Sequence, residues 1–166
     1  MKKRLAVLEL AQEKIGFAAG HTTIFSATER EALHGHNYTV ALKITAQVKD
    51  NGICEFDYRF YKKIMIELCK QLGQRFLMPT KSPYMEFSED DDYYYFVFNH
   101  KKMIFLKEDV VLLPIMNITV EELSKWFIDQ LTNDIDTIDK HLIEKLTIKV
   151  SSSPGQSGIY YWERNE

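Results

Sequence analysis

Three of the histidines in this 166-residue chain, His21, His34 and His36, lie close together in the sequence. His34 and His36 are two positions apart, so on a strand both side chains would lie on one face. An antiparallel neighbour that carries His21 can bring a third ring within about 5 Å of that face. Three imidazoles that meet at one point favour a zinc site with an open fourth position, as in catalytic zinc centres. An isolated His-x-His pattern is more often due to chance, and the spacing alone leaves that alternative open.

The histidines fall beside stretches whose apolar residues alternate as they do in strands. Residues 5–17 predict one strand, and residues 37–48 alternate more cleanly and predict a second. An Asp-Asn-Gly sequence at residues 50–52 marks a turn, and a late strand is predicted around residues 146–150. His21 then lies near the end of the first strand and beside the start of the second.

Two amphipathic helices are predicted on either side of a β-rich segment. Asp57 can cap a helix that runs to about Leu72, and Gly73 would stop it. Thr119 and Glu122 form a capping box that opens the second helix. Short β-segments between the two helices fall at residues 84–88, 93–98 and 102–106. This order predicts an α+β fold with helices on one face of an antiparallel sheet.

The composition excludes several classes of protein. Apolar residues make up 45% and charged residues 27% of the chain, as in ordinary globular proteins. The net charge of −3 provides no basic excess for nucleic acid. No apolar run reaches the roughly 18 residues of a membrane span, and no signal-peptide core is found. Cys54 and Cys69 lack metal-type spacing and are expected to be inert thiols. We therefore expect a cytoplasmic protein without a nucleic-acid or membrane partner.

The strings around the histidines resemble the 6-pyruvoyl-tetrahydropterin synthase family, which includes the 6-carboxy-tetrahydropterin synthases. An aromatic-x-Ala-x-His strand occupies residues 17–21, and His-Gly-His-Asn-Tyr follows at residues 34–38. Further strings that resemble those of the family lie at residues 109–115, 117–121 and 154–160. The segment 84–106 matches a β-hairpin insertion that one branch of the family carries.

The resemblance implies a single T-fold domain over residues 1–166, a four-stranded antiparallel sheet with two helices on one face. It implies a homo-oligomer, a trimer or a dimer of trimers, with the site between subunits. It also implies that His21, His34 and His36 hold Zn²⁺ and that the substrate is a small pterin. Zinc would polarise the side-chain oxygens of a dihydropterin and acidify the adjacent C–H bonds.

The proton-transfer residues depart from the family pattern. The family's Cys before His-Gly-His is absent here, and Glu31 is the best replacement, because some branches use Glu at this place. The alternative for Glu31 is a solvated loop acid. The family's Leu-Asp-His becomes Leu-Gly-Gln, which ends at Gln74. The Gln74 amide can orient a substrate oxygen but cannot transfer a proton at neutral pH.

The pterin anchor is changed as well. The family's Glu-Thr-Pro-Gly becomes Ser-Ser-Pro-Gly, so Ser152 offers one hydroxyl where a charged bidentate acceptor is expected. By the resemblance Thr119 and Glu121 face the substrate, although a helix cap explains Thr119 equally well.

Three functions remain open. The favoured one is a zinc-dependent lyase that acts on dihydroneopterin triphosphate or a close relative, with Glu31 as acid and base. The second is a repurposed T-fold protein that binds zinc and a planar heterocycle without turnover. The third is a structural paralogue whose aromatic insertion packs against another protein. The retention of three histidines disfavours the third, since an idle metal site has little physical reason to keep them.

Overall fold

The central sheet carries the histidines and organises the rest of the chain. The computed structural model describes residues 4–165. The strand order is β10–β9–β3–β2–β4–β8, and β1 pairs with the part of β3 that β2 leaves free. The strands are β1 (Leu5–Leu10), β2 (Gly16–His21), β3 (His34–Gln47), β4 (Phe76–Pro79), β8 (Val110–Leu113), β9 (Ile143–Ser153) and β10 (Gln156–Glu163). Strand β4 runs parallel to both of its neighbours, and the other pairs are antiparallel.

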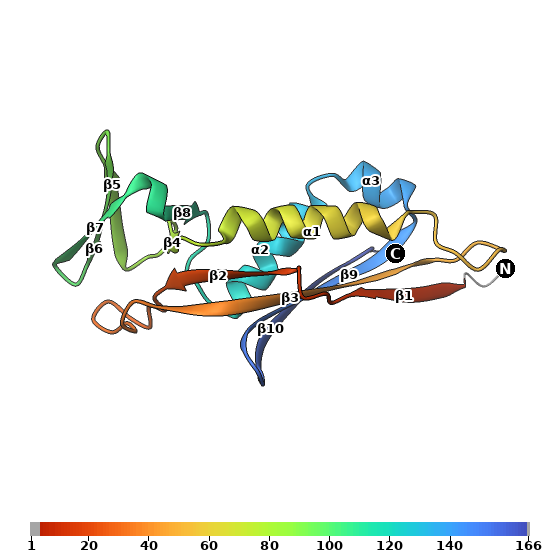
Figure 1. The fold of residues 1–166 in the computed structure, drawn as a ribbon, viewed down its shortest axis with the longest axis horizontal. Coiled ribbons are helices and arrows are strands. Elements are labelled where there is room, and N and C mark those ends of the chain that lie inside the picture. The colour runs from red at the N-terminus through yellow and green to blue at the C-terminus, as the bar shows by residue number, and fades with distance from the viewer. Residues whose placement is uncertain (1–3, 166) are drawn as a thin grey trace.

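The helices lie over one face of this sheet, which confirms the α+β architecture (Figure 1). They are α1 (Tyr58–Leu72), α2 (Val120–Thr132) and the short α3 (Ile135–Lys140). The predicted caps are confirmed, because Asp57 accepts a hydrogen bond from the Arg59 amide and Thr119 accepts one from the Glu122 amide. Within residues 4–165, no helix has both the length and the apolar character needed to cross a membrane.

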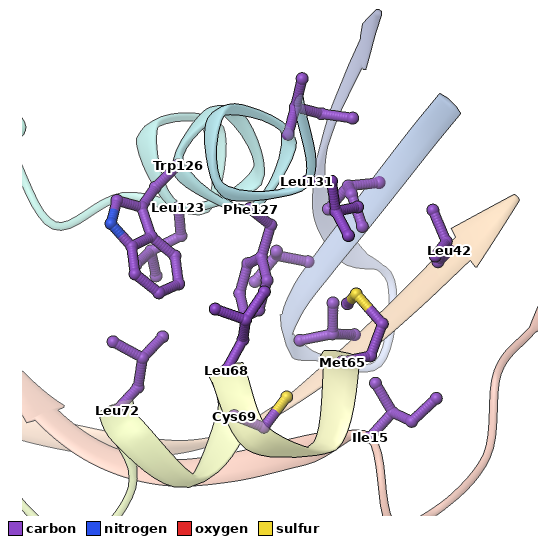
Figure 2. Packing of buried hydrophobic residues seen from close by; sticks show 14 of the residues in the cluster. Ile15, Leu42, Met65, Leu68, Cys69, Leu72, Leu123, Trp126, Phe127 and Leu131 are labelled. Atoms are coloured by element: carbon purple, nitrogen blue, oxygen red, sulfur yellow. The ribbon is translucent and has the colours of Figure 1, made fainter. Parts of the chain in front are cut away.

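The main core lies between α1, α2 and the sheet. Figure 2 shows Leu68 and Leu72 of α1 pointing toward Leu123 and Phe127 of α2. The Phe127 ring is fully buried and stands edge-on to Trp126, with 5.0 Å between the ring centroids. These contacts fix the start of α2 over the sheet, beside the end of β2.

The prediction of one strand over residues 5–17 is wrong. The chain forms β1 and then β2, separated by a turn in which the Ile15 amide donates to the Gln12 carbonyl. Both strands pair with β3 because β3 extends over 14 residues, from His34 to Gln47. Strand β3 thus begins earlier than residue 37, and both histidines of the His-x-His pattern lie within it.

The insertion is a three-stranded sheet and not a single hairpin. It consists of β5 (Met85–Glu89), β6 (Tyr93–Phe98) and β7 (Lys101–Leu106), followed by a turn of 3-10 helix at Lys107–Asp109. Asn99 and His100 have positive φ angles of 46° and 61° and form the two-residue turn between β6 and β7. The insertion packs around a second small core that contains Met78, Phe96 and Val110. The main sheet also contains more strands than the four that the resemblance implied for it.

The packing of α2 on the sheet gives a stability prediction. We expect Phe127→Ala to lower the free energy of unfolding by about 3–5 kcal/mol, because it removes a fully buried ring. Chemical denaturation followed by circular dichroism measures this loss. The control Phe60→Ala removes a ring of α1 that is 45% exposed and should cost about 1 kcal/mol or less. Equal losses for the two variants would contradict the assignment of the core.

Candidate functional site

The register of β2 against β3 brings the three histidines together. His21 lies opposite His34, and Ala19 lies opposite His36, so all three rings share one face of the sheet. One ligand nitrogen from each ring lies within 4.8 Å of the others. The convergence predicted from the spacing is therefore confirmed.

Backbone carbonyls fix the orientation of two of these rings. The Nδ1–H of His21 donates to the Ile118 carbonyl at 2.9 Å, and the Nδ1–H of His34 donates to the Ala32 carbonyl at 2.8 Å. The Nε2 lone pairs of both rings are then left facing the centre of the cluster. Carbonyl partners of this kind commonly orient histidines that bind metals.

The donor atoms fit a metal ion of the zinc type. The Nε2 atom of His21 is buried and has no hydrogen-bond partner among the described residues. The Nε2 atoms of His34 and His36 lie only 3.0 Å apart. Burial lowers the pKa of His21 and so keeps its ring in the neutral form that ligates metals. These three nitrogens could hold a cation and leave a further position open to a ligand.

Glu31 lies next to the histidine cluster. Its Oε2 atom is 3.9 Å from Nε2 of His34 and accepts a hydrogen bond from the Thr23 amide at 3.3 Å. Burial raises the pKa of Glu31, but the hydrogen bonds from Thr23 and the nearby His34 and His21 lower it more. The net pKa of Glu31 lies below its ordinary value, so the carboxylate is ionised at neutral pH.

A cavity of about 600 Å³ joins these groups to the start of α2 and to the turn between β9 and β10. The structure brings seven of the predicted site residues to its lining: His21, Glu31, His34, His36, Thr119, Glu121 and Ser152. A side chain at Gly158 would place its Cβ 2.4 Å from the Val120 carbonyl oxygen. Glycine at this position therefore allows β10 to approach the N-terminus of α2 closely and to close this side of the cavity.

Gln74 lies outside this cavity. It lines a second cavity of about 520 Å³, together with Arg75 and Phe76, and His36 borders both cavities. The Gln74 backbone has a φ of 63°, and its amide donates to the Ala18 carbonyl at 2.7 Å. Gly73, the residue at the end of α1, has a negative φ of −71°. The left-handed conformation after the helix thus falls on Gln74 and not on the glycine.

Two polar residues at the site were not identified from the sequence. The side chain of Asn117 accepts a hydrogen bond from the Ile24 amide and donates one to the Ile24 carbonyl. It also accepts a hydrogen bond from the Ile118 amide. It thereby ties the loop that carries Glu31 to the segment that orients His21. Gln156 lines the cavity beside Ser152. Both residues lie in strings that resemble the family, residues 117–121 and 154–160, and that membership is the signal by which they could have been found.

The remaining histidines and cysteines lie away from the site. His141 Nδ1 bonds to the Tyr61 hydroxyl at 2.8 Å, and His100 lies in the turn between β6 and β7. Burial raises the pKa of the Cys69 thiol to about 12, so this thiol stays protonated and is a poor nucleophile.

Comparisons with known proteins agree with this fold and site. The family model for 6-pyruvoyl tetrahydropterin synthase matches residues 10–163. A Methanocaldococcus jannaschii protein named "Putative 6-carboxy-5,6,7,8-tetrahydropterin synthase" is 25% identical over 144 residues, which cover 87% of this chain and 88% of that protein.

Solved structures share the whole fold. The crystal structure of 6-pyruvoyl tetrahydropterin synthase from Plasmodium vivax matches with a TM-score of 0.90 and 26% identity, over 97% of this chain and 99% of that one. The Plasmodium falciparum synthase matches with a TM-score of 0.89 and 26% identity, over 96% and 99%. Two solved variants of the P. vivax synthase replace a glutamate, which their names call a catalytic residue, by alanine or cysteine.

The curled sheet, with its helices on one face, is thus the T-fold of the tetrahydropterin synthases. The chain belongs to the 6-pyruvoyl tetrahydropterin synthase family.

Proposed function

We propose that this protein is a zinc-dependent lyase that processes the side chain of dihydroneopterin triphosphate or a close relative. The observation that carries the proposal is the cavity that joins three converging histidines to an ionised carboxylate. The names of the related proteins, which are pterin synthases, support the class of substrate.

The metal would be held by His21, His34 and His36, whose ligand nitrogens lie within 4.8 Å of one another. Bound zinc would supply Lewis acidity that polarises a side-chain oxygen of the substrate and acidifies the neighbouring C–H bonds. The carbonyls of Ile118 and Ala32 keep the rings of His21 and His34 turned toward the ion. The protein therefore provides the ligands without rearrangement of the two strands.

Glu31 would act as the base that removes a proton from the substrate side chain. Its carboxylate is ionised, and the bond from the Thr23 amide holds Oε2 near the histidines. A base must lie within hydrogen-bond reach of the carbon-bound proton, directly or through one water. The glutamate that the P. vivax variants replace supports a carboxylate in this role.

The opposite wall would hold the heterocycle. Thr119 and Glu121 lie at the start of α2, and Ser152 and Gln156 lie at the turn between β9 and β10. The Glu121 carboxylate can accept bonds from the amino and ring N–H groups of a pterin, and the Ser152 hydroxyl can add one further bond. With Ser152 in place of a carboxylate, this wall binds the ring with one fewer charge-assisted contact.

The alternative is a protein that binds zinc and a planar heterocycle without turnover. It is favoured by the amide at Gln74 and the hydroxyl at Ser152, which stand where the family has a proton-transferring imidazole and a carboxylate. Kinetic assays on pterin triphosphates separate the two functions.

The metal part of the proposal predicts one zinc per subunit in the purified protein, measured by elemental analysis. His34→Ala should abolish stoichiometric zinc because it removes one of three ligands. The matched control His100→Ala changes a histidine in the turn between β6 and β7 and should keep the metal. Full zinc occupancy in His34→Ala would refute the proposed ligand set.

The catalytic part predicts the effect of neutralising the base. Glu31→Gln should lower turnover by at least about 10²-fold and leave the zinc content unchanged. The control Glu29→Gln neutralises an exposed carboxylate in the same loop, outside the lining of the histidine cavity, and should keep its activity. If the wild type turns over no pterin triphosphate, and Glu31→Gln binds every ligand as well as the wild type does, the non-catalytic function replaces the lyase.

We also propose a cyclic homo-oligomer, a trimer or a dimer of trimers, in which a neighbouring subunit completes the site. Gln74 does not line the histidine cavity of its own subunit, and a site formed between subunits would give its amide a place beside the substrate. Strands β1 and β10 lie at the two edges of the antiparallel part of the sheet. Their residues Val7 and Ile159 are 62% and 61% exposed, and such apolar edges are a liability unless they are paired.

Sedimentation at micromolar concentration should therefore show an oligomer. Ile159→Lys should weaken this assembly, because it places a charge beside the edge that joins the next subunit. Ile104→Lys changes an equally exposed residue on the inserted sheet and serves as the control. A monodisperse wild-type monomer would contradict the proposed assembly.

A further inference from the structure

The inserted sheet lies against the loop that carries Glu31. Figure 1 shows β5, β6 and β7 at the end of the molecule where the chain also turns between β2 and β3. A cavity of about 350 Å³ separates the two segments. The loop lines it with residues 28–32, and the inserted sheet lines it with Phe98, Asn99, Lys101 and Met103.

Arg30 bridges this gap. Its guanidinium lies over the ring of Phe98, with 5.8 Å between Cζ and the ring centroid. The Nη1 atom of the same group donates to the Glu31 carbonyl at 2.6 Å. The Thr22 hydroxyl donates to that carbonyl as well, at 2.7 Å. The Glu31 carbonyl therefore accepts two hydrogen bonds, and the guanidinium that donates one of them also lies over a ring of the inserted sheet.

The loop is built so that a shift of Arg30 reaches Glu31. Ile24 and Arg30 form an isolated antiparallel bridge, and the Glu31 amide donates to the Thr23 carbonyl at 2.9 Å. The Thr23 amide in turn donates to the Glu31 carboxylate. A planar guanidinium can stack on a ring and donate in its own plane at the same time, which a lysine ammonium cannot do.

We propose that the inserted sheet positions Glu31 through the cation–π contact between Arg30 and Phe98. Arg30 is a positioning residue in this arrangement, since it holds the Glu31 backbone while the Glu31 carboxylate borders the histidine cavity. The cavity between loop and insertion is not an anion site, because the charges of Arg30 and Lys101 are balanced by Glu29 and Glu31 in the same lining. The kinetic part of this inference rests on the proposed function of Glu31.

Hydrogen exchange of the loop tests the contact without any assay of activity. In the full-length protein, Phe98→Leu and Arg30→Gln should each speed the exchange of amides in residues 22–33 by about 3-fold to 30-fold. The double variant should exchange no faster than Arg30→Gln alone, because Phe98→Leu removes only a contact that Arg30→Gln removes as well. Phe87→Leu changes another ring of the inserted sheet, away from Arg30, and should leave the loop protected. Unchanged exchange, additive effects, or an equal effect of Phe87→Leu would overturn the proposal.

Kinetics then test whether the contact acts through Glu31. Arg30→Gln should lower kcat with little change in KM, and Arg30→Lys should not restore it, because lysine lacks the planar group. In a Glu31→Gln background Arg30→Gln should have no further effect on kcat. A rise in KM alone, with normal loop exchange, would show that Arg30 contacts the substrate instead and would overturn the positioning role. If no turnover is found at all, the proposed function fails while the exchange experiment still decides this inference.

Discussion

The site depends above all on the register of β2 against β3. In the observed register His21 faces His34 and Ala19 faces His36, so the three rings share the helix-covered side of the sheet. A slip of β2 by one residue would turn all of its side chains to the opposite face and separate His21 from the other two rings. The stacked pair of Phe17 and Tyr38, both buried, sets this register because a slip would expose both rings.

The helices contribute as positioning elements. The Ile118 carbonyl that orients His21 lies just before α2, and Asn117 connects that segment to the loop of Glu31. Packing of Leu123 and Phe127 on α1 and the sheet fixes where α2 begins. The core is thus coupled to the site, since a displacement of α2 would move the carbonyl that holds the His21 ring.

Much of this arrangement could be predicted from the sequence, and the failures have physical causes. The starts of α1 and α2 follow from Asp57 and Thr119, because helix caps are local signals. The convergence of the histidines follows from the two-residue period of a strand. The sequence does not reveal the break between β1 and β2, because the turn contains the apolar Ile15, which is as buried as a core strand residue. The cavity of Gln74 and the cation–π contact between Arg30 and Phe98 depend on tertiary contacts between segments far apart in the chain, for which the sequence has no local signal.

The departures from the family pattern fall on two separate places in the structure. The three histidines, Glu31 and Ser152 line one cavity formed by a single chain, whereas Gln74 lines another. Under the proposed function, the changes would affect recognition of the ring and the proton-transfer groups, and the three proposed metal ligands are retained. Under the proposed function, a carboxylate that removes a proton can return it to another atom of the same substrate once the first bond has broken. Because Gln74 provides no imidazole and lies outside the histidine cavity, the proposed function requires Glu31 to serve first as base and then as acid.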